Sequence, residues 1–294
     1  MMSVSNYYYT CAAQLKRSAA SRSGQSQACR RAKNQRYKYS YSTHASSNPL
    51  ERLEELGTRR FGALFEFEGV LVSCSRKSEQ EDWVKLASEH HLKTPSDYEL
   101  RVAYRRKSDF AISQIFHWEL DSQRVKYLSE QKSLLLYEKV LKTTSLRETV
   151  RSFLQLLHKF GIPCAVYSSQ FTTSQLSDLL HLLQVAEYFL PRPNTAHSES
   201  LIIGCDYLQN GLPDTEIFTT LANKLSRSIS KCVVLSDNHL AIEATSELGM
   251  KCVIVATTES VWELQHADMV VTSLSCISFR NLQNLFRLEV NERS

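Results

Sequence analysis

The 294-residue sequence lacks several features that would place it in a common class of protein. Nowhere do 18 apolar residues follow one another, so we expect no membrane-spanning helix and no membrane partner. The eight cysteines form no Cys-x-x-Cys pair and no cluster with histidine at the spacing of a zinc site. Most of those beyond residue 60 lie in apolar runs, which predicts reduced, buried thiols in a reducing or redox-buffered compartment.

Acidic residues are absent from the first fifty positions, which carry eight lysines and arginines. The net charge of +4 is therefore unevenly distributed, because the rest of the chain holds 27 basic and 31 acidic residues. A mildly acidic folded part argues against nucleic acid as the main partner.

Residues 1–50 are rich in Ser, Ala, Arg and Tyr and contain no continuous apolar segment. This composition is typical of an organellar transit peptide and excludes a secretory signal, so we predict a disordered targeting segment. The tyrosine-rich basic tract at 36–41 could instead stack on nucleobases. Composition alone leaves plastid and mitochondrion open as destinations.

Beyond residue 60 the chain alternates between apolar strands and amphipathic helices. The predicted strands are 61–67, 162–167, 201–203, 231–235, 251–256 and 269–271, and the predicted helices between them are 145–160, 172–183, 214–225 and 240–248. This alternation predicts an α/β fold whose parallel sheet is covered by helices on both faces. Residues from about 79 to 142 show only helical periodicity, with breaks near 94–97 and 120–122, so a helical insertion follows the first strand.

Two carboxylates follow the first strand in the stretch 61–72. Glu66 and Glu68 stand one residue apart, so strand alternation points both side chains to one side. They lie at the carboxyl end of the strand, where open α/β sheets bind ligands. Gly69 then allows a sharp turn. A binding or catalytic site is expected at this position.

The stretch 61–72 resembles motif I of the haloacid dehalogenase (HAD) superfamily, an apolar strand followed by Asp-x-Asp-Gly-x-Leu. Across residues 61–285 the order of features is similar to β-phosphoglucomutase-like members. This resemblance implies a Rossmann-like core at 51–76 and 143–294 with an all-helical C1 cap inserted at 77–142. The strings at 65–71, 250–253, 263–264 and 267–271 resemble plant plastid HAD phosphatases of riboflavin synthesis more narrowly. That likeness favours the plastid stroma over the mitochondrion.

The resemblance implies a role for each matching residue. Glu66 takes the nucleophile position and Glu68 that of the general acid and base. Ser168 matches the motif II hydroxyl, which donates to a transferring phosphoryl group, and Ser169 beside it would bind substrate. Magnesium, the expected cofactor, would be held by Glu66, the backbone carbonyl of Glu68, and Asp237. A helix cap is the alternative role for Ser168.

The cap of such proteins selects the substrate, and Lys107 matches a basic cap position that reaches a substrate phosphate. Its neighbours Arg105 and Arg106 are expected to be solvated charges, since adjacent helix residues cannot all face one cleft.

The sequence departs from the motifs at four positions. Glutamates replace both motif I aspartates, and Leu212 stands where motif III has its lysine. Ser236 replaces the first acid of motif IV, leaving at best a weak contact to a ligand of the ion and not to the ion itself. Each glutamate places its carboxylate roughly 1 Å or more from the aspartate position, a displacement that can cost about 10²-fold in rate. Leucine cannot supply the charge of a lysine.

Two functions follow from these observations. The first is a magnesium-dependent phosphomonoesterase with weakened motifs, acting on a small phosphorylated metabolite such as 5-amino-6-(5-phospho-D-ribitylamino)uracil. The alternative is a catalytically inactive HAD-fold protein that binds a phosphorylated ligand or a protein partner. The sequence leaves the oligomeric state open.

Overall fold

The computed structural model describes residues 61–143, 145–190, 200–256 and 264–287. All of them belong to one compact unit, residues 55–294. The predicted transit peptide at 1–50 and the first ten residues of the predicted core lie outside the described residues. No helix of the described part is both long enough and apolar enough to cross a membrane.

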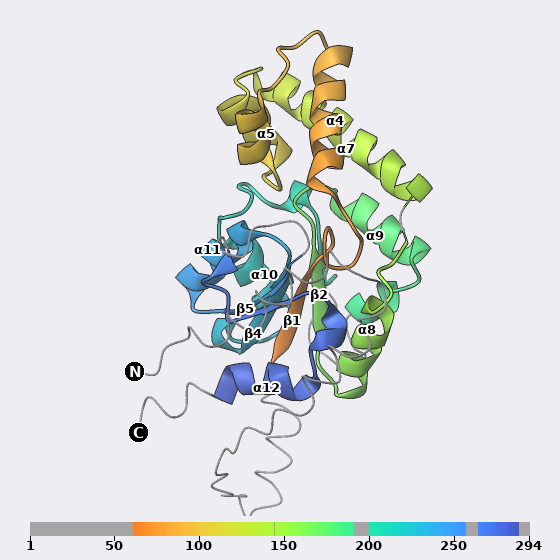
Figure 1. Cartoon of the computed structure of the whole chain (residues 1–294), viewed down its shortest axis with the longest axis vertical. Coiled ribbons are helices and arrows are strands. Elements are labelled where there is room, and N and C mark those ends of the chain that lie inside the picture. Colours follow the sequence, from red (N-terminus) through yellow and green to blue (C-terminus); the bar gives the residue numbers. More distant parts are fainter. Residues whose placement is uncertain (1–60, 144, 191–199, 257–263, 288–294) are drawn as a thin grey trace, which may run out of the picture. The chain divides into compact units, whose positions relative to one another are not determined.

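Six parallel strands form one sheet in the order β3-β2-β1-β4-β5-β6. Figure 1 labels the four central strands β2, β1, β4 and β5. Their bounds are β1 Gly62–Glu66, β2 Cys164–Tyr167, β3 Ile202–Ile203, β4 Cys232–Ser236, β5 Lys251–Val255 and β6 Met269–Val271. The predicted α/β fold with a parallel sheet is confirmed. The strand order reverses between β1 and β4, and sheets of this kind bind ligands at the carboxyl ends of the strands beside such a reversal.

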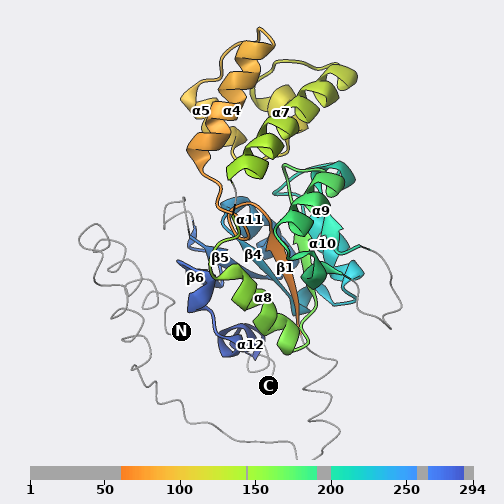
Figure 2. The same cartoon turned by 90° about the vertical axis from the view of Figure 1, so that its right-hand side faces the viewer.

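Alternate residues of the strands pack against helices on opposite faces. Phe65 and Val166 belong to an apolar cluster with α8, α9 and α12, whereas Leu64 and Val234 belong to another with α10 and α11 (Figure 2). The helices are α8 Val150–Lys159, α9 Thr173–Leu182, α10 Glu216–Lys224, α11 His239–Leu248 and α12 Phe279–Arg287. Burial on both faces explains why the strands read as continuous apolar runs.

A helical insertion separates β1 from α8, and it has an apolar core of its own. It contains α4 Arg76–Glu89, α5 Asp97–Ala103, the short α6 Ser108–Phe110 with a π-helical turn at Ala111–Ile115, and α7 Ser122–Thr143. Trp83, Leu86, Ile112 and Leu128 are buried together in this core. A separate core is what a cap domain requires, although the boundaries 77 and 142 stay predictions.

Two helices differ from the prediction. The helix expected from residue 145 begins only at Val150, because Leu146 pairs with Val72 and the amide of Arg147 donates to Leu71 O at 3.1 Å. That backbone is therefore bonded to the loop after β1 rather than within a helix. The closing helix α12 is absent from the predicted elements, although Leu282, Leu285 and Phe286 recur at helical spacing and are buried.

All six cysteines in the described residues are free, but only half of them are buried, since Cys74 and Cys205 are partly exposed and Cys276 is exposed. Cys164, Cys232 and Cys252 are buried, and burial raises the pKa of the Cys252 thiol to about 12. These thiols therefore behave as small apolar side chains and not as nucleophiles.

Candidate active site

The carboxyl ends of β1, β2 and β4 bring the predicted site residues together. Glu66 ends β1, Ser236 ends β4 with Asp237 directly after it, and Ser168 follows β2. Parallel register makes them neighbours, since Phe65 pairs with Val166 and with Leu235. All four side chains are fully buried.

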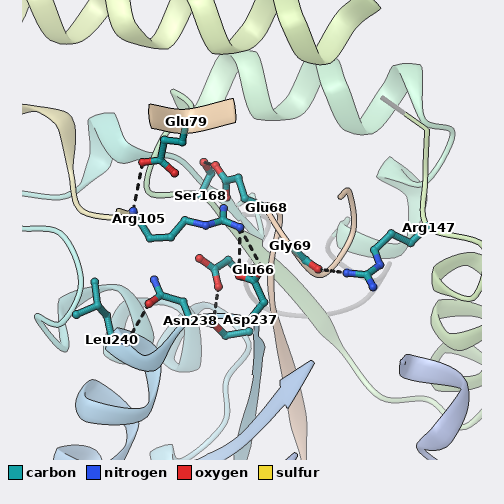
Figure 3. A network of polar contacts seen from close by, with 11 residues as sticks. Glu66, Glu68, Gly69, Glu79, Arg105, Arg147, Ser168, Asp237, Asn238 and Leu240 are labelled. Atoms are coloured by element: carbon teal, nitrogen blue, oxygen red, sulfur yellow. Dashed lines mark hydrogen bonds and ion pairs between the residues drawn. The ribbon is translucent and has the colours of Figure 1, made fainter. Parts of the chain in front are cut away.

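The loop after β1 holds Asp237 close to the backbone. Gly69 has a φ of +81°, and a Cβ at this position would lie 1.9 Å from Asp237 Oδ2. The loop is closed by the Gly69 amide, which donates to Val72 O at 2.8 Å, and by Arg147, whose guanidinium donates to Gly69 O (Figure 3). Only glycine allows both this turn and the close approach of the carboxylate.

Each motif I glutamate accepts a hydrogen bond from a serine of a neighbouring strand end. Ser236 Oγ donates to Glu66 Oε2, and Ser168 Oγ donates to Glu68 Oε1. Ser236 thus bonds Glu66, a predicted metal ligand, because the two residues end adjacent strands; its expected role as an outer contact of the ion stays a prediction. Ser168 also accepts from the amides of Gln170 and Phe171 at 3.0 and 2.8 Å, so it caps the turn as well.

Burial dominates the electrostatics of both glutamates. Removal from water raises the pKa of Glu66 from 4.5 to about 8, and Asp237 and Glu68 add to the rise, while Arg105 and the bond from Ser236 lower it. Burial also raises the pKa of Glu68, against the lowering effects of Arg105 and Ser168. The remaining oxygens, Glu66 Oε1 and Glu68 Oε2, are buried without a hydrogen-bond partner among the described residues.

Arg105 from the cap forms an ion pair with Asp237. Its Nη2 lies 3.1 Å from Oδ1 and 3.2 Å from Oδ2 of Asp237, and the two side chains are 1% and 0% exposed (Figure 3). Burial lowers the pKa of Arg105, but Asp237, Tyr104 and Glu66 outweigh it and hold the pKa above its usual value. The expectation that Arg105 is a solvated charge is therefore wrong.

The donor types of this site suit magnesium, which prefers carboxylate and carbonyl oxygens in octahedral geometry. The arrangement does not fit it. Both oxygens of Asp237 face the Arg105 guanidinium, and among the described residues no three His, Cys, Asp or Glu side chains are placed to hold a metal ion together.

Other predicted residues lie near the site without joining it. Lys107 Nζ donates to the carbonyls of Leu208 and Gln209 at 2.7 and 3.2 Å. Ser169 is buried, and its hydroxyl has no hydrogen-bond partner among the described residues. Leu212 is 3% exposed and packs in the apolar cluster beneath α10. Being a leucine, it supplies no charge to the site.

Two cavities lie along the segment 105–107. A small one of about 180 Å³ is lined by Glu68, Glu79 and Arg105. A cleft of about 1130 Å³ is lined by Arg106 and Lys107 of the cap and by core residues 209–214. The smaller cavity has room for a phosphoryl-sized group, whereas the larger has the volume of a metabolite site.

Sequence reasoning missed the parts of the site that depend on the cap. Arg105 is one of three consecutive basic residues, and nothing in the local pattern distinguishes it from Arg106. Its backbone φ of +62° turns it away from its neighbours and toward the core, a conformation that no side-chain pattern indicates.

Comparisons with known proteins agree with this architecture. A HAD hydrolase of family IA, variant 3, from Entamoeba histolytica superposes with a TM-score of 0.63 at 20% identity, covering 77% of this chain and 99% of that one. A β-phosphoglucomutase from Clostridium difficile gives 0.64 at 16% identity, covering 79% and 99%. The chain therefore has the fold of the HAD-type hydrolases.

Among curated proteins, the chain is similar to the chloroplastic 5-amino-6-(5-phospho-D-ribitylamino)uracil phosphatase of Arabidopsis thaliana. The two are 28% identical over 245 residues, which are 83% of this chain and 63% of that protein. The chain thus spans less than two thirds of this relative. No family model matches the sequence. The predicted resemblance to HAD hydrolases and to this group of plant phosphatases is confirmed.

Proposed function

We propose that this protein is a HAD-type phosphatase-like protein that binds a small phosphorylated metabolite and turns it over slowly. The observation that carries the proposal is the meeting of Glu66, Glu68, Ser168 and Asp237 at the carboxyl ends of β1, β2 and β4, beneath a helical cap. The similarity to a curated phosphatase supports the class of reaction.

Hydrolysis at this site would take two steps. A carboxylate oxygen of Glu66 forms a bond to phosphorus while the bond to the ester oxygen breaks, and protonated Glu68 gives its proton to that oxygen. Water then attacks the phosphorus of the acyl phosphate, Glu68 accepts its proton, and phosphate leaves with Glu66 regenerated. Because burial raises the pKa of Glu66 to about 8, a minority of molecules would carry the ionised nucleophile at neutral pH.

The substrate we propose is 5-amino-6-(5-phospho-D-ribitylamino)uracil, on the strength of the similar phosphatase. The cleft of about 1130 Å³ has the volume for a molecule of this size, and Lys107 lines it, as its proposed role in binding substrate requires. The chloroplastic relative supports the further proposal that the protein acts in the plastid stroma. The resemblance implies a magnesium ion, but the arrangement around Asp237 does not fit one, so no step is assigned to it.

A catalytically silent binding protein is the second candidate. Two observations favour it: Leu212 leaves motif III without its lysine, and Asp237 is paired with Arg105. In this case the fold would bind the same class of phosphorylated ligand without cleaving it.

Phosphate release from an aryl phosphate, sugar phosphates and the ribitylamino phosphate distinguishes the two. We expect slow release by the wild type and none by Glu66→Gln, while Glu243→Gln on the exposed side of α11 keeps the wild-type rate. Phosphate release that persists in Glu66→Gln would show that hydrolysis does not take place at this site. Binding of these phosphates without any release would establish the silent protein.

A further inference from the structure

The guanidinium of Arg105 is delivered to the acidic site by a backbone that is fixed on both sides. The φ of +62° is unusual for arginine and costs energy that surrounding contacts must offset. Its amide donates to Glu79 Oε1 at 3.3 Å. The next carbonyl, of Arg106, accepts from Gln170 Nε2 at 2.9 Å, and Lys107 bonds the core loop at Leu208.

The charges at this position are buried and close together. Glu66, Glu68 and Asp237 are at most 1% exposed, so their ionised forms need a cation nearby. Arg105 is the largest cation buried in the described part of the chain, and its Nη2 contacts both oxygens of Asp237. Removing one partner of a buried pair leaves an uncompensated charge, so this contact fixes the cap segment to the core.

We propose that Arg105 is the resident cation of this site, so that its guanidinium occupies the position beside Asp237 that a divalent ion would need. Two cations a few ångström apart repel each other strongly at low dielectric, so binding of Mg²⁺ at Asp237 and pairing with Arg105 exclude one another. The cap thus supplies the positive charge that Leu212 cannot supply at the motif III position. The inference rests on the proposed function only for the location of the site.

Manganese binding tests this inference independently of turnover. The full-length protein is titrated with Mn²⁺, and free Mn²⁺ is measured by electron paramagnetic resonance, with Mg²⁺ as competitor. The variants are Arg105→Gln, Asp237→Asn and the double variant. Arg106→Gln is the matched control, because Arg106 is the adjacent arginine of the cap. In the described residues its guanidinium donates a hydrogen bond to Val102 O and lies over the Phe110 ring.

We expect the wild type and Arg106→Gln to have no Mn²⁺ site at Asp237, so that changing Asp237 to Asn leaves their Mn²⁺ binding unaltered. Arg105→Gln should bind one ion at least about tenfold more tightly, and the double variant should lose it. A folded Arg105→Gln protein without this gain would overturn the inference. Should Arg105→Gln fail to fold, the comparison of the wild type with Asp237→Asn decides. One Mn²⁺ ion that the wild type binds and Asp237→Asn loses would overturn the inference, whereas the absence of such an ion from the wild type would support it.

Discussion

Glutamate in place of aspartate changes the partners of the motif I carboxylates at the scale of single residues. The longer side chains reach the hydroxyls of Ser236 and Ser168 at neighbouring strand ends. Each carboxylate therefore has one bonded oxygen and one buried oxygen without a partner in the described residues. Such a buried carboxyl group is tolerated while it is protonated, but its ionised form lowers the stability of the folded state.

Glu66→Gln should therefore change how stability depends on pH. The folded state holds the proton of Glu66 up to about pH 8, while the unfolded state loses it near 4.5, so the wild-type free energy of unfolding falls as pH rises between these values. Glutamine resembles the protonated form and does not ionise. Relative to the wild type, Glu66→Gln should gain roughly 2 kcal/mol or more between pH 5 and pH 9.

Urea unfolding of both proteins at a series of pH values measures this difference. Glu243→Gln, an exposed substitution on α11, is the control and should follow the wild type. A difference between Glu66→Gln and the wild type that is constant from pH 5 to pH 9 would show that Glu66 ionises normally in the folded protein.

Gly69→Ala tests the close approach of Asp237 to the loop after β1. The added Cβ would lie 1.9 Å from Asp237 Oδ2 at a φ of +81°, so the carboxylate and the loop would both have to move. We expect a loss of roughly 3–5 kcal/mol, measured by urea unfolding. Gly249→Ala is the matched control: it also has a positive φ, of +63°, but nothing lies within 4 Å, so about 1 kcal/mol of backbone strain is expected. Equal losses in the two variants would mean that backbone strain alone, and not Asp237, requires Gly69.

At the scale of elements, the sequence predicts the sheet and its helices because their signals are local. Apolar runs and helical periodicity locate the strands of the core and most helices within a few residues. The late start of α8 could not be predicted, because Leu146 and Arg147 bond a loop some 75 positions earlier in the chain. The convergence of Glu66, Glu68 and Asp237 follows from strand ends, whereas Arg105 enters through the cap, and only the folded chain brings those two together.

Leu212→Lys tests whether the loop before α10 can accommodate a cation at the motif III position. Leu212 is buried among apolar residues of the cluster beneath α10, so a lysine there loses hydration unless it finds a carboxylate. We expect a loss of about 3 kcal/mol or more in urea unfolding. Leu212→Met conserves volume and should cost less than about 1.5 kcal/mol. A lysine variant as stable as the methionine variant would show that the ammonium reaches either a carboxylate or the adjoining cleft.

At the scale of the whole molecule, the charge is unevenly distributed between the first fifty residues and the rest of the chain. The first fifty residues carry basic side chains and no acid, whereas the described part buries three acids, Glu66, Glu68 and Asp237, at one site. The net charge of the whole chain is thus no guide to the ligand. We expect the positive segment to direct import into a plastid, and we propose that the folded part binds a phosphorylated metabolite.

A fluorescent protein fused to residues 1–60 should accordingly enter plastids of plant cells, because an Arg- and Ser-rich segment without acid has the composition that organellar import selects. The matched control is a fusion of residues 61–294, which keeps the strand β1 and should remain outside the organelle. Replacing the eight basic residues of the first fifty with glutamine should abolish import, since it removes charge while preserving length. Mitochondrial accumulation of the first fusion would contradict the plastid assignment, and fluorescence that stays in the cytosol would contradict targeting by this segment altogether.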